Sequence, residues 1–323
     1  MRPMVTGGLG VNGSWVVRRL VESGVRPLVV DRREDFSLLQ DCVGRFDLVV
    51  ADIGDREGMI QLLQAQGVDR IIHLAAYISP DMDQEPWTVF EVNAHGTVVL
   101  LEAAHRAGVG RFVFASSRAV YGETPRGVGE PGYRPLHEDH PKNPVMAYDV
   151  CKLASENMGC VYRNAFGLEF AALRFAGIYG PGKQARHGKM SLRSRLVEDP
   201  FEGRPVVVPA GGDQLDDMIY VEDVADALTR AALAERLPHA AYNIASGVGR
   251  TLADFAAAVK QALPAARIDV GPGLNPLGHN VHYYAIYDVT RAREDLGFSP
   301  RFDLTAGVAR YVETLRRWRG GQA

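Results

Sequence analysis

Residues 6–13 read Thr-Gly-Gly-Leu-Gly-Val-Asn-Gly and directly follow a short apolar run. Gly7, Gly10 and Gly13 are spaced three residues apart, and residues 14–22 then carry apolar side chains at helical spacing. A strand, a glycine-rich turn and a helix in this order present unpaired backbone N–H groups to a phosphate. The segment therefore predicts an α/β fold that begins with a pyrophosphate-binding loop.

Short apolar runs alternate with helical patterns through the first half of the chain. We expect strands at 27–30, 47–50, 71–75, 111–115 and 168–175, and a helix at 93–107. This alternation implies parallel βαβ units, so residues 1–176 predict a doubly wound parallel sheet. Residues 177–323 are less regular and predict a smaller mixed α/β domain, partly interleaved with the first. Its expected helices lie near 222–235, 251–262 and 305–318.

Composition and charge exclude several classes of function. The chain has 323 residues, of which 46% are apolar and 23% charged, and its net charge of −3 favours neither nucleic acid nor an acidic membrane as partner. Its apolar runs are too short to cross a bilayer, and its N-terminus does not read as a signal peptide. Cys42, Cys151 and Cys160 predict free thiols in a reducing cytoplasm. His279 and His282 lack a third ligand, so we expect no metal site.

Acidic residues after the second and third strands point to the bound cofactor. Asp31 lies about twenty residues beyond the glycine loop, where a carboxylate accepts hydrogen bonds from an adenosine ribose and repels a 2′-phosphate. This position favours NAD over NADP. Arg32 and Arg33 argue the other way, because an arginine there can pair with a 2′-phosphate. Asp52 is placed either to contact the adenine amino group or to stabilise a turn.

Tyr148 and Lys152 lie one helical turn apart in Tyr-Asp-Val-Cys-Lys and therefore share a helix face. A free tyrosine titrates at about pH 10, but an ammonium group and a positive nicotinamide ring beside it would lower this pKa. Ser117 follows the fifth strand, at the sheet edge where such folds bind ligands. We predict that these three residues move the proton that accompanies a hydride transfer.

These features, with others along nearly the whole chain, resemble the extended short-chain dehydrogenase/reductases of the NAD-dependent epimerase/dehydratase family. Matching elements include His73-Leu-Ala-Ala76, Asn93-x-x-Gly96-Thr97 and Tyr220-Val-Glu-Asp-Val224. The resemblance implies a Rossmann domain, the catalytic residues Ser117, Tyr148 and Lys152, and often a homodimer built from helices near 93–107 and 148–164. It also implies NAD contacts from Gly7, Leu9, Gly10, Gly13, Asp31, Asp52, Ile53, Leu74, Ala75, Ala76, Asn93, Tyr148 and Lys152.

Three departures from the family pattern bear on the substrate. Gly177 stands where sugar-nucleotide members carry an asparagine, and Asp216 stands where they carry an arginine. Both changes would remove contacts to a substrate diphosphate, and a carboxylate would repel it. Dehydratases carry Asp-Glu after the triad hydroxyl, but this chain has Arg118-Ala119. Arg118 either faces an acidic group of the substrate, or points to solvent or a loop carboxylate such as Glu123.

We therefore expect an NAD-dependent oxidoreductase of a small polar alcohol or ketone (a sugar, sugar acid or hydroxy acid), with Tyr148 as general base and acid. The alternative is a sugar-nucleotide epimerase with retained NAD and a transient keto intermediate. A third hypothesis is a non-catalytic NAD-binding protein. Expected substrate contacts are Ser117, Arg118, Gly177, Asp216 and Tyr77, with further candidates in Ser79, Trp87, Arg186, His187 and Lys189.

Overall fold

The computed structural model describes residues 1–79, 82–124, 127–184, 191–278 and 281–320. Within them the largest layer is a parallel sheet of seven strands, in the order β10-β6-β5-β4-β1-β2-β3. The strands are β1 (Pro3–Thr6), β2 (Leu28–Asp31), β3 (Asp47–Val50), β4 (Arg70–His73), β5 (Arg111–Ser117), β6 (Glu169–Phe175) and β10 (Ala241–Ile244). The predicted doubly wound parallel sheet is confirmed.

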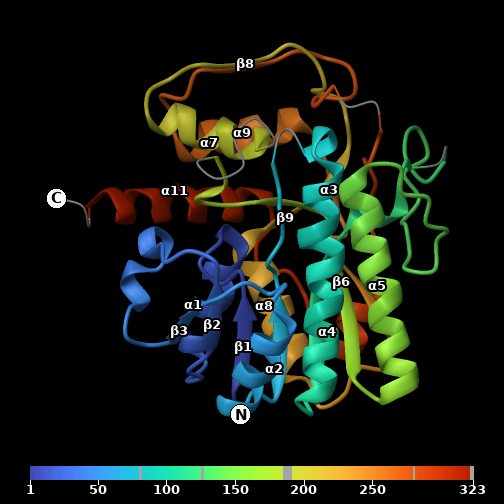
Figure 1. The fold of residues 1–323 in the computed structure, drawn as a ribbon. Helices are drawn as coiled ribbons and strands as arrows, with labels where there is room; N and C mark the ends of the chain where they lie inside the picture. Colours follow the sequence, from blue (N-terminus) through green and yellow to red (C-terminus); the bar gives the residue numbers. More distant parts are fainter. Residues whose placement is uncertain (80–81, 125–126, 185–190, 279–280, 321–323) are drawn as a thin grey trace.

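Helices cover both faces of this sheet (Figure 1). One face carries α1 (Val11–Glu22) and α8 (Val221–Leu233), and the other carries α2 (Arg56–Ala65), α4 (Gly96–Arg106) and α5 (Ala147–Phe166). Successive residues of a strand point to opposite faces. Val5 and Met4 of β1 accordingly enter two different apolar clusters, one beneath each set of helices. The core of the sheet therefore has two separate layers.

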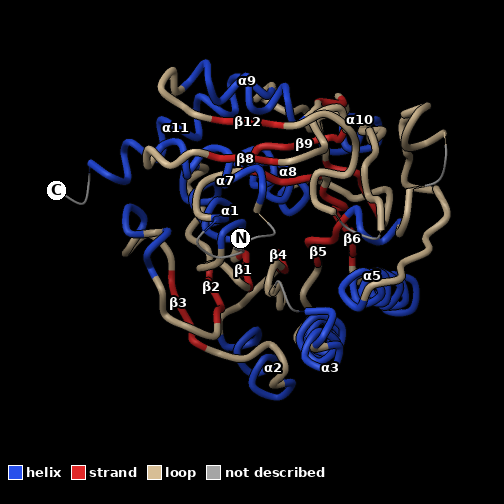
Figure 2. The backbone as a smooth tube through the Cα atoms, turned by 90° about the horizontal axis from the view of Figure 1, so that it is seen from above, coloured by secondary structure: helices blue, strands red, loops and turns tan. Residues whose placement is uncertain are grey.

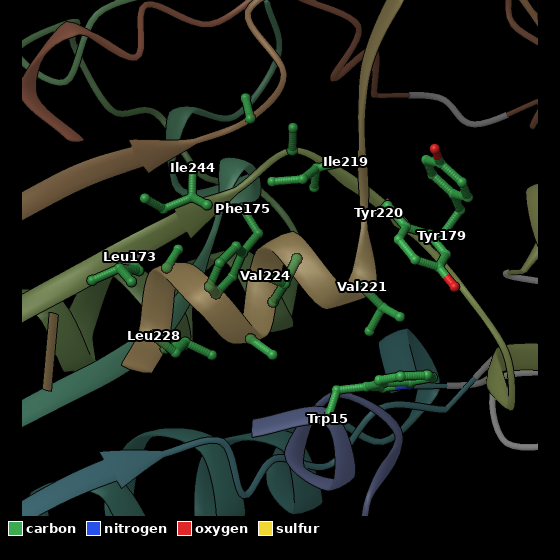
Figure 3. Packing of buried hydrophobic residues seen from close by; sticks show 14 of the residues in the cluster. Trp15, Leu173, Phe175, Tyr179, Ile219, Tyr220, Val221, Val224, Leu228 and Ile244 are labelled. Atoms are coloured by element: carbon green, nitrogen blue, oxygen red, sulfur yellow. The ribbon is translucent and has the colours of Figure 1, made fainter. Parts of the chain in front are cut away.

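The layer beneath α8 is drawn in Figure 3. Val224 and Leu228 of α8 lie over Leu173 and Phe175 of β6 and Ile244 of β10. All five side chains are buried. Burying an apolar side chain of this size contributes about 1.5–3 kcal/mol. α8 and β10, which come from the second half of the sequence, therefore belong to the core of the seven-stranded sheet.

Most of the remaining elements of the second half lie beyond the carboxyl ends of the large sheet (Figures 1 and 2). A three-stranded mixed sheet pairs β7 (Gly177–Tyr179) in parallel and β11 (Gly249–Arg250) antiparallel with β9 (Asp216–Tyr220). A second small sheet pairs β8 (Val206–Val208) with β12 (Ile268–Val270). The helices here are α7 (Leu192–Phe201), α9 (Leu252–Ala262) and α11 (Leu304–Gly320), whereas α10 (Thr290–Leu296) packs against α8 and β10. The smaller mixed part is thus present, while the division at residue 176 stays a prediction.

Short helical segments fill the connections of the first half. They are η1 (Phe36–Leu38), η2 (Gln40–Cys42), η3 (Met82–Gln84), α3 (Pro86–Val89), the π-helical η4 (Phe90–His95) and η5 (Arg118–Tyr121). The helix predicted from residue 93 therefore starts earlier and changes its winding at Gly96. Among the described helices, none has the length and apolar character that a membrane crossing requires.

The strand predicted at 111–115 continues for two more residues, and this extension matters for the site. Ser116 and Ser117 still pair in register with Arg174 and Phe175 of β6. The extra pairing keeps β5 regular up to its last residue. Ser117 is therefore held by the sheet rather than by a loop.

A buried ion pair ties β6 to α5. The Nη2 atom of Arg174 lies 2.6 Å from Oε2 of Glu156, and both side chains are only 5% exposed. Arg174 also donates to the Tyr121 hydroxyl and to the carbonyl of Glu138 in the long loop before α5. Ser116 donates its hydroxyl hydrogen to Oε1 of the same Glu156 over 2.5 Å. One network therefore connects two strands, the catalytic helix and the loop.

Replacing Arg174 by leucine should lower the free energy of unfolding by about 3–5 kcal/mol, because Glu156 would remain buried without its cation. The matched control is Arg106→Leu, which removes the 65% exposed partner of Glu102 and should cost no more than about 0.5 kcal/mol. Urea unfolding measures both variants. Equal losses would contradict the role assigned to the buried pair.

Candidate active site and cofactor cleft

The glycine loop between β1 and α1 has room for nothing larger than hydrogen at two positions. Gly7 has a φ of +65°, and a Cβ built there would lie 2.8 Å from the Cα of Ala75. A Cβ on Gly13 would lie 2.1 Å from the carbonyl oxygen of Gly7. The loop closes through a 3.1 Å hydrogen bond from the Gly10 N–H to that same oxygen. This tight turn leads directly into α1, whose first-turn N–H groups suit a phosphate.

Asp31 fixes a negative charge beside the loop. Its Oδ2 accepts a hydrogen bond from the backbone N–H of Leu9 over 3.1 Å, and its Oδ1 accepts one from Arg32 over 2.8 Å. The first bond joins the end of β2 to the middle of the glycine loop. The contribution of Leu9 is therefore its backbone N–H, which orients the Asp31 carboxylate. Asp31 is held where the sequence predicted a ribose-binding carboxylate.

A cavity of about 420 Å³ extends along the glycine loop and the ends of β2, β3 and β4. It is lined by the predicted residues Gly7, Gly10, Gly13, Asp31, Asp52, Ile53, Leu74, Ala75, Ala76 and Tyr77. Asn12 also lines it, and its buried Oδ1 has no hydrogen-bond partner within the described chain. Such an acceptor suits a ligand hydroxyl. The glycine cradle, the carboxylate and this acceptor together fit a dinucleotide, and sequence reasoning had missed Asn12 although it lies within the motif.

Two predicted or motif residues support this cleft from behind. The fully buried His73 contacts the hydroxyls of Thr6 (2.6 Å) and Thr97 (3.0 Å). Burial, with a smaller effect of the Lys152 charge, lowers the pKa of His73 to about 3, so its ring is neutral. Asn93 accepts from the N–H of Tyr77 over 2.6 Å and donates to its carbonyl over 3.0 Å. Asn93 thus shapes the wall after β4, and its own contact with NAD stays a prediction.

Ser117, Tyr148 and Lys152 meet where β5 ends and α5 begins. Ser117 is the last residue of β5 and also caps η5 by accepting from the N–H of Ala119. The Ser117 hydroxyl acts on the Tyr148 phenol and lowers its pKa. Lys152 donates to the carbonyl of Ala115 over 2.7 Å, and its Nζ lies 5.5 Å from the centre of the Tyr148 ring. Residues that are distant in sequence therefore form the expected constellation.

The pKa of Tyr148 is not lowered in this structure, contrary to the prediction from the sequence. Burial raises the pKa of Tyr148, the Asp149 carboxylate raises it further, and the hydrogen bond from Ser117 lowers it. The protein by itself therefore does not produce the predicted lowering, because a phenolate in a dry interior is costly. Burial lowers the pKa of Lys152 to about 8, which leaves the ammonium mostly charged at neutral pH. A positive ring beside Tyr148 would act in the direction opposite to burial.

The residues that depart from the family pattern form a cluster with an arginine that sequence reasoning missed. Arg118 does not pair with a loop carboxylate such as Glu123: its Nη1 lies 2.5 Å from Oδ1 of Asp216. Arg193 of α7 pairs with the other oxygen of Asp216. A Cβ on Gly177 would lie 2.9 Å from Nη1 of Arg193, so this guanidinium occupies the space above the glycine. Asp216 is therefore not a lone negative charge.

The other substrate candidates are more scattered. Tyr77 lines the cofactor cleft and donates its hydroxyl hydrogen to Glu85, while Trp87 on α3 is 69% exposed. Arg186, His187 and Lys189 lie outside the described residues, as does His279. Over the part of the chain that the structure describes, no group of three or more His, Cys, Asp or Glu side chains could hold a metal ion.

Comparison with known proteins agrees with this geometry. Residues 4–245 match the model of the NAD dependent epimerase/dehydratase family, and the chain belongs to this family of NAD-dependent enzymes. UDP-glucose 4-epimerase of Mycolicibacterium smegmatis is 34% identical over 98% of this chain and 99% of its own. The Thermotoga maritima UDP-glucose 4-epimerase, solved with UDP-glucose, has a TM-score of 0.85 at 27% identity (98% and 99% coverage). MoeE5, solved with UDP-glucuronic acid and NAD, has a TM-score of 0.81 at 30% identity and the same coverage.

Gly13→Ala should weaken NAD binding at least about tenfold, because the new methyl group must displace the loop that approaches the pyrophosphate. The control is Gly110→Ala, whose Cβ would have an ordinary 3.7 Å contact with the carbonyl of Asp69. Calorimetric titration with NAD compares the two variants with the unmodified protein. An unchanged affinity in the Gly13 variant would show that the loop does not hold the cofactor.

Proposed function

We propose that the protein is an epimerase of a sugar nucleotide, which inverts one hydroxyl-bearing carbon through a transient keto intermediate. The observation that carries this proposal is the pairing of Asp216 with Arg118 and Arg193. Asp216 and Gly177 had argued against a diphosphate substrate, since the usual cation and amide are missing. In the structure both oxygens of Asp216 are paired with guanidiniums, so Asp216 presents no lone negative charge that would repel a diphosphate.

The comparisons favour the same reading over the dehydrogenase of a small alcohol that the sequence first suggested. Relatives that extend over the whole chain include UDP-glucose 4-epimerases. The nucleotide is therefore proposed to be uridine diphosphate. MoeE5 has been solved in complex with UDP-glucose and in complex with UDP-glucuronic acid. Similarity to these relatives therefore does not indicate whether the sugar is neutral or acidic.

Each catalytic side chain has one role in the proposed reaction. Tyr148 takes the proton of the substrate hydroxyl and later returns it to the keto oxygen. Ser117 donates a hydrogen bond to that oxygen and holds it beside the phenol. The Lys152 ammonium supplies positive charge next to the ring and favours the phenolate. NAD, which the glycine loop and Asp31 would hold, would supply the reversible hydride transfer at the substrate carbon.

The test is turnover of UDP-sugars that differ at one carbon. We expect interconversion in both directions with no net rise in absorbance at 340 nm, and NAD that copurifies with the protein. Stoichiometric accumulation of NADH on a simple sugar or hydroxy acid would instead support the dehydrogenase hypothesis.

Tyr148→Phe should lower kcat by about 10²–10⁴-fold, the usual contribution of a general acid–base group. Tyr162→Phe is the matched control on the same helix, because its hydroxyl contacts only Glu102 at a distance from the cleft. Its kcat should be unchanged, and both variants should melt close to the unmodified protein. A Tyr148 variant that keeps full activity would restore the hypothesis of a non-catalytic NAD-binding protein.

We also propose that two copies pair through α5 and its neighbours. Val150 and Val161 are 47% and 50% exposed, and eleven residues, about three turns, separate them on one face of α5. Trp87 and Phe90, on elements that pack against α5, are exposed as well. A row of apolar side chains of this kind is typical of an interface.

Charges placed in this row test the dimer. The double variant Val150→Glu with Val161→Glu should sediment as a monomer, whereas Val207→Glu on β8, where the side chain is 61% exposed, should not alter the mass. A monomeric unmodified protein would contradict the proposal.

The cellular setting is proposed from the thiols. Cys42, Cys151 and Cys160 are free, and the first two are buried. Free thiols suit a reducing compartment, so we place the enzyme in the cytoplasm with a small molecule as its substrate.

A further inference from the structure

The cluster around Asp216 contains more positive than negative charge. Arg118 and Arg193 pair with its two oxygens, and their side chains are 12% and 16% exposed. Two guanidiniums therefore share the single carboxylate of Asp216.

The carboxylate of Asp217, the next residue, does not neutralise this excess positive charge. Asp217 follows Asp216 in β9 and points to the opposite face of the strand. There it accepts hydrogen bonds from Ser246 and from the N–H of Gly247. Its charge is thus committed to a different set of donors.

Uncompensated buried charge is costly, and a protein retains it only when something else supplies the counter-charge. One donor of the cluster is also unused: Nε of Arg193 is buried and has no hydrogen-bond partner among the described residues. A guanidinium with a free N–H and surplus charge fits an anionic group that arrives with the substrate. The cluster is therefore incomplete as an internal ion pair.

The position of the cluster indicates which part of the substrate it meets. Arg118 directly follows Ser117, the residue proposed to hold the reacting oxygen. Ser117 pairs in register with Phe175, two residues before Gly177, over which Arg193 lies. Asp216 lies two residues before Met218, the register partner of Gly177. Arg193 is therefore linked through Asp216 to Arg118, the residue that directly follows Ser117.

We propose that Arg118 and Arg193 bind a carboxylate carried by the sugar ring, so that the substrate is a nucleotide-linked uronic acid. This inference rests on the proposed function and makes its substrate class specific. The two oxygens of a carboxylate attached to the sugar ring can accept paired hydrogen bonds from a guanidinium. The carboxylate also supplies the missing negative charge. A neutral hydroxymethyl group at the same place leaves that charge uncompensated. Asp216 is a positioning residue, which orients both guanidiniums.

The experiment compares kcat/KM for UDP-glucuronic acid with kcat/KM for UDP-glucose, alongside the affinity for UDP alone. The unmodified enzyme should prefer the acid. Arg193→Met and Arg118→Met should each lower the ratio of acid to neutral kcat/KM by about 10–100-fold, as expected for a lost hydrogen bond between charged groups. Arg195→Met, on the same helix with its guanidinium at the carbonyl of Val207, should leave the ratio unchanged.

Two further variants separate positioning and folding from recognition. Asp216→Asn should raise KM for the acid more than it changes kcat, because the guanidiniums lose their orientation while the reacting groups stay in place. Arg193→Lys keeps the charge and the fold but loses the fork, so it should recover part of the preference. Thermal melting of every variant identifies any loss that comes from unfolding.

Other outcomes have distinct meanings. If the arginine variants weaken binding of UDP alone and of both sugars equally, the cluster holds the diphosphate and the uronic acid proposal is wrong. A preference for UDP-glucose in the unmodified enzyme would overturn it as well. If no UDP-sugar binds or turns over, it is the proposed function itself that fails.

Discussion

The ion pair between Arg174 and Glu156 is the interaction on which the geometry of the site depends. Glu156 lies one turn beyond Lys152 on α5 and also accepts a hydrogen bond from Ser116, the neighbour of Ser117. The carboxylate therefore fixes the register of the catalytic helix against the end of β5. A buried pair of this kind adds little net stability compared with an apolar core, but breaking it is costly. Its effect here is to join α5, which carries Tyr148 and Lys152, to the ends of β5 and β6.

Burial acts on the catalytic pair in a consistent direction. It raises the pKa of Tyr148 and lowers that of Lys152, so in both cases it favours the neutral form. The proposed reaction needs the charged forms of both residues. A positively charged nicotinamide favours the phenolate only while it lies beside the ring. In the proposed reaction, oxidised NAD bound beside Tyr148 would therefore favour proton transfer by this residue.

Substrate recognition shows how charge can be relocated within a family fold. This chain carries Gly177 and Asp216 where sugar-nucleotide members of the family carry an asparagine and an arginine. The sequence alone therefore indicates that the substrate site has lost an amide and a cation. In the structure the glycine makes room for Arg193, and the aspartate orients Arg193 and Arg118. The proposed site therefore keeps positive charge but presents it from α7 and from Arg118 of η5, which follows Ser117.

The sequence by itself determined the features that depend on short spacing. The glycine loop, Asp31 at the end of a strand, and the one-turn separation of Tyr148 and Lys152 are local patterns, because backbone geometry fixes their outcome within a few residues. Tertiary structure decided the rest. Arg193 belongs to no motif, and its place above Gly177 depends on how α7 packs beyond the sheet. The partner of Arg118 comes from a strand 98 residues away, and the pKa of Tyr148 follows from burial by segments that are distant in the chain. Sequence spacing carries no information about such contacts, since they form only when separate elements pack together.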